Sequence, residues 1–301
     1  MALPKLTTPT YELEIPSTDE KIKYRPFLVK EEKILMMALE SKQEKDITQA
    51  VKDIVKECTF NKVSIDNMPM FDVEYIFLNI RSKSVGEVSK LKILCPDDKK
   101  TYADVELDLN EVNVQVGEDH TNKIDLGNGT GMIMQYPSID SFKDSGIRDI
   151  NASNMLEVIS TCILQIYEDE GKKVYNSKDQ TQKELTDFIE QLNTKQFKDV
   201  QKFFDTMPKL KHEITVKNPK TKVESKITLS GLNDFFRIAL SHDSLENYYT
   251  TNFSLMQHHN YSLSDLENML PWEREIYVDM LITYIKEENE KEKRRQQGLG
   301  K

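Results

Sequence analysis

The chain has 301 residues, of which 38% are hydrophobic, so it can bury a core, and this argues against a fully disordered chain. Its 51 acidic residues outnumber 41 basic ones and give a net charge of −10. Because phosphate contacts need clustered Lys and Arg, this balance argues against a nucleic-acid partner or an anionic membrane. No apolar run approaches the roughly 20 residues that span a bilayer, and the N-terminus lacks the apolar stretch of a secretory signal, so we expect a cytosolic protein with no membrane contact.

The first third of the chain changes from an alternating to a helical pattern. Tyr11, Leu13 and Ile15 alternate with acidic residues, and the alternation resumes over 22–28, which predicts a β-hairpin. Apolar spacing then predicts two amphipathic helices over 30–58. Pro69 predicts the start of a third helix, which runs to about Lys83, is apolar on more than one side and is expected to be the central core element.

Residues 88–136 alternate around two turns, one at 95–100 and one at 127–131, and therefore predict antiparallel hairpins. The second turn, Gly127-Asn128-Gly129-Thr130-Gly131, has several glycines but no Lys after them and does not open a helix. We interpret it as a hairpin turn and not as a phosphate-binding loop.

The middle of the chain is predicted to be helical. One stripe of apolar residues predicts a helix, and the capping box of Thr181 and Glu184 predicts the start of the next helical stretch, which continues to Phe204. The stripe consists of Met155, Leu156, Ile159, Ile163 and Ile166. Alternation around Asn218-Pro219 predicts a second hairpin region, and helices follow from Gly231 to the end.

These patterns predict an α+β fold class, with antiparallel β-hairpins combined with amphipathic helices and a helical C-terminal module. We expect a mixed α+β domain over 1–150, a helical segment with the second β-hairpin over 151–240, a helical interaction module over 241–290 and a charged, disordered tail over 291–301. The turns at Cys95-Pro96 and Asn218-Pro219 resemble each other, but hairpins with Pro and Lys at the tip often arise without common ancestry, so an internal repeat is the minority interpretation.

The sequence has no recognisable pattern for catalysis or metal binding. Cys58, Cys95 and Cys162 are scattered, without a C-x-x-C pair, so we expect three small buried hydrophobic residues in a reducing compartment. The adjacent His258 and His259 would point about 100° apart on a helix, a poor geometry for one metal. H-E-x-x-H, G-x-S-x-G and a Cys/His nucleophile set are also missing. We therefore expect no enzyme, no metal and no cofactor.

The region 248–277 concentrates aromatic residues and Met in an otherwise polar stretch, and these residue types are enriched in protein interfaces. The candidate interface residues are Tyr248, Tyr249, Phe253, Met256, Tyr261, Met269, Trp272, Arg274 and Tyr277. Ordinary helix packing inside the chain is an equally weighted alternative, because an aromatic stripe at helical spacing is most often core. Trp272, directly after Pro271 at an expected helix start, is the preferred anchor.

Several stretches resemble the baseplate hub and hub-assembly proteins of T-even-like bacteriophages with contractile tails. They are Leu3–Leu6, Tyr24–Lys33, Phe71–Arg81, Phe203–Leu210, Leu229–Phe236 and His258–Arg274. The resemblance covers most of the chain and implies a late, non-enzymatic structural subunit of the baseplate hub region, assembled in the host bacterial cytoplasm and kept in the virion tail. Its partners would be other baseplate, hub and tail proteins, with self-association as an option. The alternative is a transient chaperone that leaves before the virion matures, and an enzyme with an unrecognised site ranks last.

Overall fold

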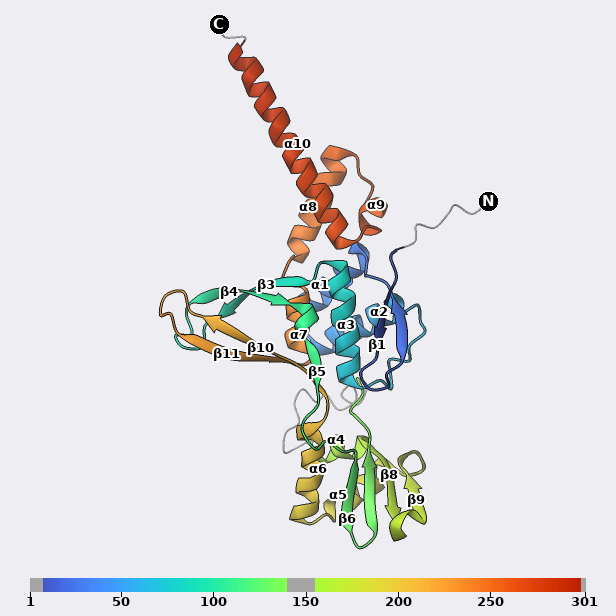
Figure 1. Cartoon of the computed structure of the whole chain (residues 1–301). Helices are drawn as coiled ribbons and strands as arrows, with labels where there is room; N and C mark the ends of the chain where they lie inside the picture. Colours follow the sequence, from blue (N-terminus) through green and yellow to red (C-terminus); the bar gives the residue numbers. More distant parts are fainter. Residues whose placement is uncertain (1–7, 140–154, 299–301) are drawn as a thin grey trace, which may run out of the picture.

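The computed structural model describes residues 8–139 and 155–298 and contains helices and antiparallel sheets, which confirms the α+β fold class (Figure 1). Three predicted features lie outside the described residues. They are the Leu3–Leu6 motif, the boundary at residue 150 and the last three residues of the tail.

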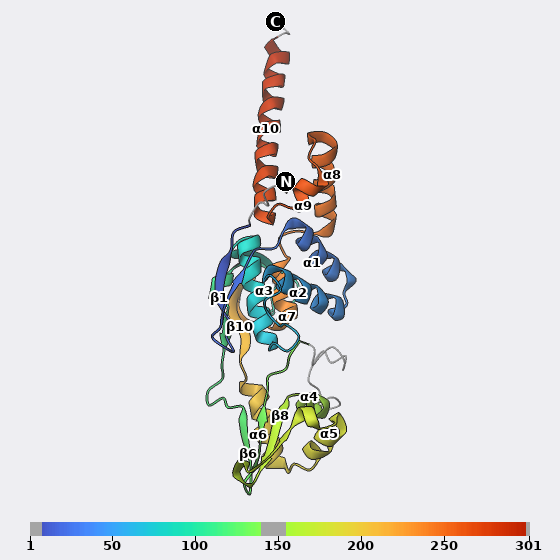
Figure 2. The same cartoon turned by 90° about the vertical axis from the view of Figure 1, so that its right-hand side faces the viewer.

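The N-terminal hairpin and helical pair are confirmed. Strands β1 (Tyr11–Glu14) and β2 (Lys21–Tyr24) pair antiparallel, and helices α1 (Val29–Ser41) and α2 (Glu44–Cys58) follow. Helix α3 (Met70–Ser84) is surrounded by the other elements of this body (Figure 2). Apolar residues on more than one side of α3 are buried, so the prediction of a central core helix is confirmed.

Three ionisable side chains are buried along α3. Asp72 accepts a hydrogen bond from the Ser17 backbone N–H at 3.1 Å, and burial raises the pKa of its carboxyl group to about 6. Glu74 is 5% exposed, and burial raises its pKa to about 8. Arg81, 1% exposed, donates hydrogen bonds to the carbonyl oxygens of Ala239 and Gly86 at 3.1 and 2.5 Å. The central helix therefore packs with buried polar groups as well as apolar ones.

Two long hairpins extend from one side of this body, on the left of Figure 1. The first consists of β3 (Val88–Leu94) and β4 (Tyr102–Asp108), and the second of β10 (Lys209–Lys217) and β11 (Glu224–Ser230). A short helical turn (Leu109–Glu111) leads to β5 (Asn113–Gln115), which pairs with β10 to complete a three-stranded sheet. Apolar side chains of both hairpins share one core with α7 (Gly231–Ala239). The hairpins are confirmed as predicted.

A lower lobe contains a four-stranded sheet of order β6-β7-β8-β9 and three helices (Figure 1). Its elements are β6 (Lys123–Gly127), β7 (Thr130–Met134), α4 (Met155–Thr161), β8 (Ile163–Glu168), β9 (Lys173–Asn176), α5 (Gln182–Glu190) and α6 (Thr194–Thr206). Asn128 and Gly129, with φ of 56° and 73°, connect β6 to β7. Positive φ at both loop residues matches the right-handed twist of the strands, so the glycine-rich stretch is a hairpin turn.

The predicted helix through Ile166 is wrong beyond Thr161. The helix ends there, and Ile163 and Ile166 lie on β8, which pairs with β7 and β9. Isoleucine is β-branched and favours strands. In β8 the backbone N–H and C=O groups form hydrogen bonds with the two neighbouring strands, whereas in a helix they would form them within the helix itself. The Thr181 capping box is confirmed, since its hydroxyl accepts the Glu184 N–H and Glu184 Oε2 accepts the Thr181 N–H.

The described cores group the chain differently from the predicted domains. One core is built from residues 124–207 alone, whereas the buried residues of two others come from the first 112 residues and from 210–240, joined in one of them by Ile139. The Gly117 N–H donates to the Thr206 carbonyl oxygen at 2.9 Å, where the lobe joins the body. The boundary at residue 150 stays a prediction.

Two further expectations concern the cysteines and the tail. The three cysteines are free and buried, as predicted, and burial raises the pKa of the Cys162 thiol to about 12. The last helix, α10, extends from Pro271 to Gly298, well into the tail predicted to be disordered from residue 291. Glu–Lys and Glu–Arg pairs one turn apart, such as Glu290–Arg294, support a helix even where no apolar face exists.

In the described part of the chain, no helix is long and apolar enough to cross a membrane.

Candidate interaction site

The C-terminal module consists of α8 (Leu245–His259), α9 (Leu263–Glu267) and α10, and it stands on the end of the body opposite the lower lobe (Figures 1 and 2). Local sequence sets its helix ends. The Ser244 hydroxyl accepts the Asn247 N–H, Asn260 adopts φ of 60° after α8, and the Ser262 hydroxyl accepts the Asp265 N–H. Ser at the N-cap and Asn in the left-handed region are the residues that these positions favour.

The module is attached to α1. The Val29 backbone N–H donates to the Met269 carbonyl oxygen at 3.0 Å, and Lys33 pairs with Glu267 at 2.7 Å. Tyr248, 1% exposed, packs with Val29 in a small apolar cluster and donates its hydroxyl to Glu267 Oε1 at 3.2 Å. These contacts give the module a fixed place on the body.

A buried ionic cluster strengthens the attachment. Glu32, fully buried on α1, lies 2.6 Å from His242 Nε2 and 3.6 Å from the Arg274 guanidinium. Arg274 also pairs with Asp243 at 2.9 Å, and its guanidinium lies 5.4 Å from the centre of the Tyr248 ring. Buried charges that lose a partner are costly, so this cluster resists any movement of α10 away from α1.

Exposed apolar residues lie on α8 and at the start of α10. Tyr249, Phe253 and Met256 follow one another at spacings of four and three, which place them on one side of α8. All three are exposed, with Phe253 at 65%, and Trp272 and Tyr277 on α10 are exposed as well. We call these five residues together the aromatic face; those of α8 share one side of that helix, whereas Trp272 and Tyr277 lie about 140° apart around α10. Aromatic side chains in water on a well-ordered helix are typical of a binding surface.

The nine predicted interface residues therefore separate into groups. Tyr248 and Arg274 are buried within the chain, and Met269 and Tyr261 are partly buried. The other five form the aromatic face. The packing alternative holds for Tyr248 and Met269, and an interface role for the exposed residues stays a prediction.

Sequence reasoning missed further exposed apolar residues on α10 and all of the buried ionic cluster except Arg274. The missed residues on α10 are Ile276, Met280, Ile282 and Tyr284. The first, second and fourth recur at i, i+4 and i+8, a spacing visible in the sequence. The ionic cluster had no such signal, since Glu32, His242 and Arg274 come from three distant segments.

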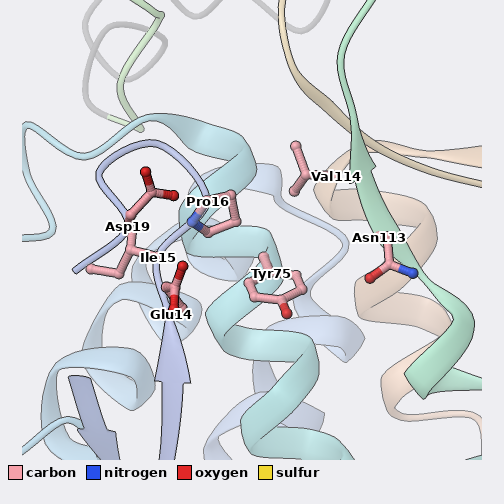
Figure 3. Close-up of a pocket in the computed structure, with 7 residues that line it drawn as sticks. All are labelled: Glu14, Ile15, Pro16, Asp19, Tyr75, Asn113 and Val114. Carbon is pink, nitrogen blue, oxygen red and sulfur yellow. The ribbon is translucent and has the colours of Figure 1, made fainter. Parts of the chain in front are cut away.

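Two features of the described residues bear on metal binding and catalysis. None of them forms a group of three or more His, Cys, Asp or Glu side chains suited to a metal. One pocket of about 210 Å³ lies between the β1–β2 turn, α3 and β5 (Figure 3). Its lining consists of Glu14, Ile15, Pro16, Asp19, Tyr75, Asn113 and Val114, a set without a Cys, Ser, His or Lys that could form a nucleophile–base pair.

Two family models match the chain, and the border between their ranges falls close to the junction of the body and the C-terminal module. Residues 8–237 match the family model described as T4 bacteriophage base plate protein. Residues 239–284 match the model of the C-terminal domain of the baseplate hub assembly protein Gp51. No curated protein and no solved structure matched the chain. With the first match covering most of its length, the chain belongs to the T4 bacteriophage base plate protein family and carries a baseplate hub assembly domain after it.

Proposed function

We propose that this protein is a structural subunit of the central hub region of a contractile-tail baseplate, where it acts through protein–protein contacts. The observation that carries the proposal is the aromatic face, all of whose residues lie within the hub assembly domain. The family is one of baseplate and assembly proteins and not of enzymes, and the proposal includes no catalytic step.

In the proposed mechanism, one set of contacts holds the C-terminal module rigidly on the body, and the aromatic face binds the partner. Attachment to α1 and the buried ionic cluster hold α8 and α10 in place, so the aromatic face is presented without a large loss of conformational freedom on binding. A hub protein with an apolar groove would bury Trp272, Tyr249 and Phe253. Such aromatic side chains commonly supply most of an interface's binding energy.

Its partners would be other baseplate, hub and tail proteins, met in the cytoplasm of the infected bacterium during assembly. In this proposal the finished location is the tail baseplate of the virion. A second copy of the chain is a further candidate to cover the aromatic face. In that case the molecular mass of the purified protein in solution would be that of a dimer or larger oligomer and not that of one chain.

A transient assembly factor is the second candidate function. The description of the matched C-terminal domain as part of a hub assembly protein favours it specifically. Such a factor would bind hub parts through the same face and leave before the particle matures. Its interface would be smaller and wetter than that of a permanent subunit.

Quantitative mass spectrometry of purified intact virions separates the two functions. We expect peptides of this chain at a constant, low ratio to the known tail proteins. Peptides found in infected-cell lysate but not in purified virions would assign the protein to assembly alone.

Variants of the aromatic face test the binding mechanism shared by both functions. We expect Phe253→Ala combined with Trp272→Ala to lower recovery of hub proteins from infected cells by about tenfold or more. Tyr175→Ala, an exposed aromatic residue on β9, is the matched control and should change nothing. Equal recovery with the double variant and the control would refute the proposed mechanism.

A further inference from the structure

The two long hairpins are joined at their ends. Asn218 Nδ2 donates hydrogen bonds to both carboxylate oxygens of Asp97 at 2.9 and 3.1 Å, and the Thr221 hydroxyl donates to Asp97 Oδ2. We call residues 95–101 and 218–223 the joined tip, which lies at the left edge of Figure 1, far from the C-terminal module. The joined tip is therefore one ordered surface and not two independent loops.

Both turns of the joined tip have the same backbone geometry. The Lys99 N–H donates to the Cys95 carbonyl oxygen at 2.9 Å, and the Lys222 N–H donates to the Asn218 carbonyl oxygen at 2.9 Å. Lys99 and Lys222 have φ of 51° and 65°, in the left-handed region. Gly or Asn adopts this conformation at lower cost than Lys. Each turn therefore presents a lysine at the same point of the turn.

Four exposed lysines gather here without ionic partners. Among the described residues, no salt bridge involves Lys99, Lys100, Lys220 or Lys222. Lysines nearer the body on the same hairpin are paired instead, since Lys217 lies 2.9 Å from Glu224. The ammonium groups at the tip thus remain available to carboxylates from outside the chain.

The two aspartates at the tip are engaged by uncharged donors. Asp97 accepts from Asn218 and Thr221, and Asp98 accepts from the N–H groups of Lys100 and Thr101 and from the Thr101 hydroxyl. These hydrogen bonds lower the pKa of both carboxyl groups, so both stay ionised at neutral pH. They hold the turns together, and neither forms a salt bridge with a lysine of the tip.

Exposed apolar side chains lie next to the lysines. Leu94 and Tyr102 are directly paired across β3 and β4, so their side chains share one face, and Val223 is exposed at the end of the other turn. Exposed lysines beside exposed aromatic and aliphatic side chains supply both the charged and the apolar contacts of a protein interface.

We propose that the joined tip is a second docking surface, which binds an acidic segment of a neighbouring protein. Four ammonium groups would pair with its carboxylates, while Tyr102 and its apolar neighbours contact its aliphatic side chains. A nucleic acid fits less well, because the cluster is compact and the rest of the chain is acidic. This inference does not depend on the aromatic face.

Binding of the full chain to poly-L-glutamate provides the first test. We expect Lys99→Asn, Lys100→Gln, Lys220→Gln and Lys222→Asn together to weaken this binding by about tenfold. The melting temperature should stay equal or rise, because Asn adopts the left-handed region more readily than Lys. The matched control replaces four exposed lysines of α5 and α6, Lys183, Lys195, Lys198 and Lys202, with Gln and should bind as the parent does. Equal losses in both variants, or tighter binding to single-stranded DNA than to poly-L-glutamate, would overturn the proposal.

Carbodiimide cross-linking in infected cells provides the second test, because it joins lysine amines directly to carboxylates in contact with them. We expect the tip lysines to be linked to Asp or Glu residues of another phage protein, in the parent and in the Phe253→Ala, Trp272→Ala variant alike. Links from the tip only to this chain or a second copy of it, or no links from the tip, would contradict the inference. Tip links that persist when the aromatic-face variant no longer recovers hub proteins would separate this surface from the proposed function.

Discussion

Glu74 makes a pH-dependent contribution to the stability of the body that one substitution isolates. Its carboxyl group is 5% exposed on α3, and burial raises its pKa from an ordinary value of 4.5 to about 8, while a backbone hydrogen bond from Leu232 acts weakly in the opposite direction. Between these pH values the folded chain keeps a proton that the unfolded chain has released. Stability therefore falls as pH rises through this window.

The size of the effect follows from the two pKa values. A difference of one pKa unit corresponds to about 1.4 kcal/mol, so raising the pH from 5 to 8 should remove about 3 kcal/mol of the contribution of Glu74. Glu74→Gln keeps the shape of the side chain but cannot ionise. The variant should gain about 3 kcal/mol relative to the parent over the same pH range, whatever its stability at pH 5.

Urea unfolding followed by circular dichroism at pH 5, 6, 7 and 8 measures this difference. Taking the difference between variant and parent cancels the contribution of the other groups, including that of Asp72, whose raised pKa acts in the same direction. Glu40→Gln, at an exposed position on α1, is the control and should give a flat difference. A flat difference for Glu74→Gln as well would refute the assignment of a buried, protonated carboxyl group.

Three other predictions address the attachment of the module, the lower lobe and the thiols. Arg274→Met should leave Asp243 and Glu32 without the guanidinium that pairs with both, cost about 3–5 kcal/mol and raise hydrogen exchange in α8 and α10, whereas exposed Arg294→Met should not. Unchanged exchange would contradict the role given to the cluster. Gly131→Ala should destabilise the lobe by about 1–3 kcal/mol, because the new Cβ would lie 2.7 Å from the Ile124 carbonyl oxygen. In a thermal melt with two steps, only the step that reports unfolding of the lobe should move to lower temperature. Burial should protect all thiols from Ellman's reagent until urea unfolds the chain, and rapid reaction in buffer would count against it. The thiols are Cys58, Cys95 and Cys162.

Local signals predicted most of the fold, and distant pairing accounts for the failures. The Thr181 capping box and the Asn128-Gly129 turn depend on neighbouring residues, so they could be identified in the sequence. Strand β8 depends on β7, some thirty residues earlier, and its isoleucines also fit the spacing of a helix that ends at Thr161. A short apolar run cannot by itself distinguish the two.

The same distinction applies to the candidate site. Aromatic composition was enough to find Phe253 and Trp272, which are exposed. Composition could not show that Tyr248 and Arg274 are directed inward, because their partners on α1 are more than 200 residues away in the chain. Which residues of an aromatic helix face water is decided by the surface on which the helix packs.

The lower lobe leaves and rejoins the body through two strands that are already neighbours. Gln115, on β5, is paired with Lys209, on β10, and the elements of the lobe lie between them in the chain. If the lobe were removed, a short turn could connect β5 to β10 as an ordinary antiparallel hairpin, with the three-stranded sheet retained and Ile139 as the one buried residue lost from the body cores. A unit inserted at such a point can be lengthened or exchanged with little effect on the remaining protein, provided that residues 137–139, which contact the start of α3, are kept. The strand pairing at its base thus leaves the rest of the lobe free to differ in sequence and size without a change in the sheet that carries it.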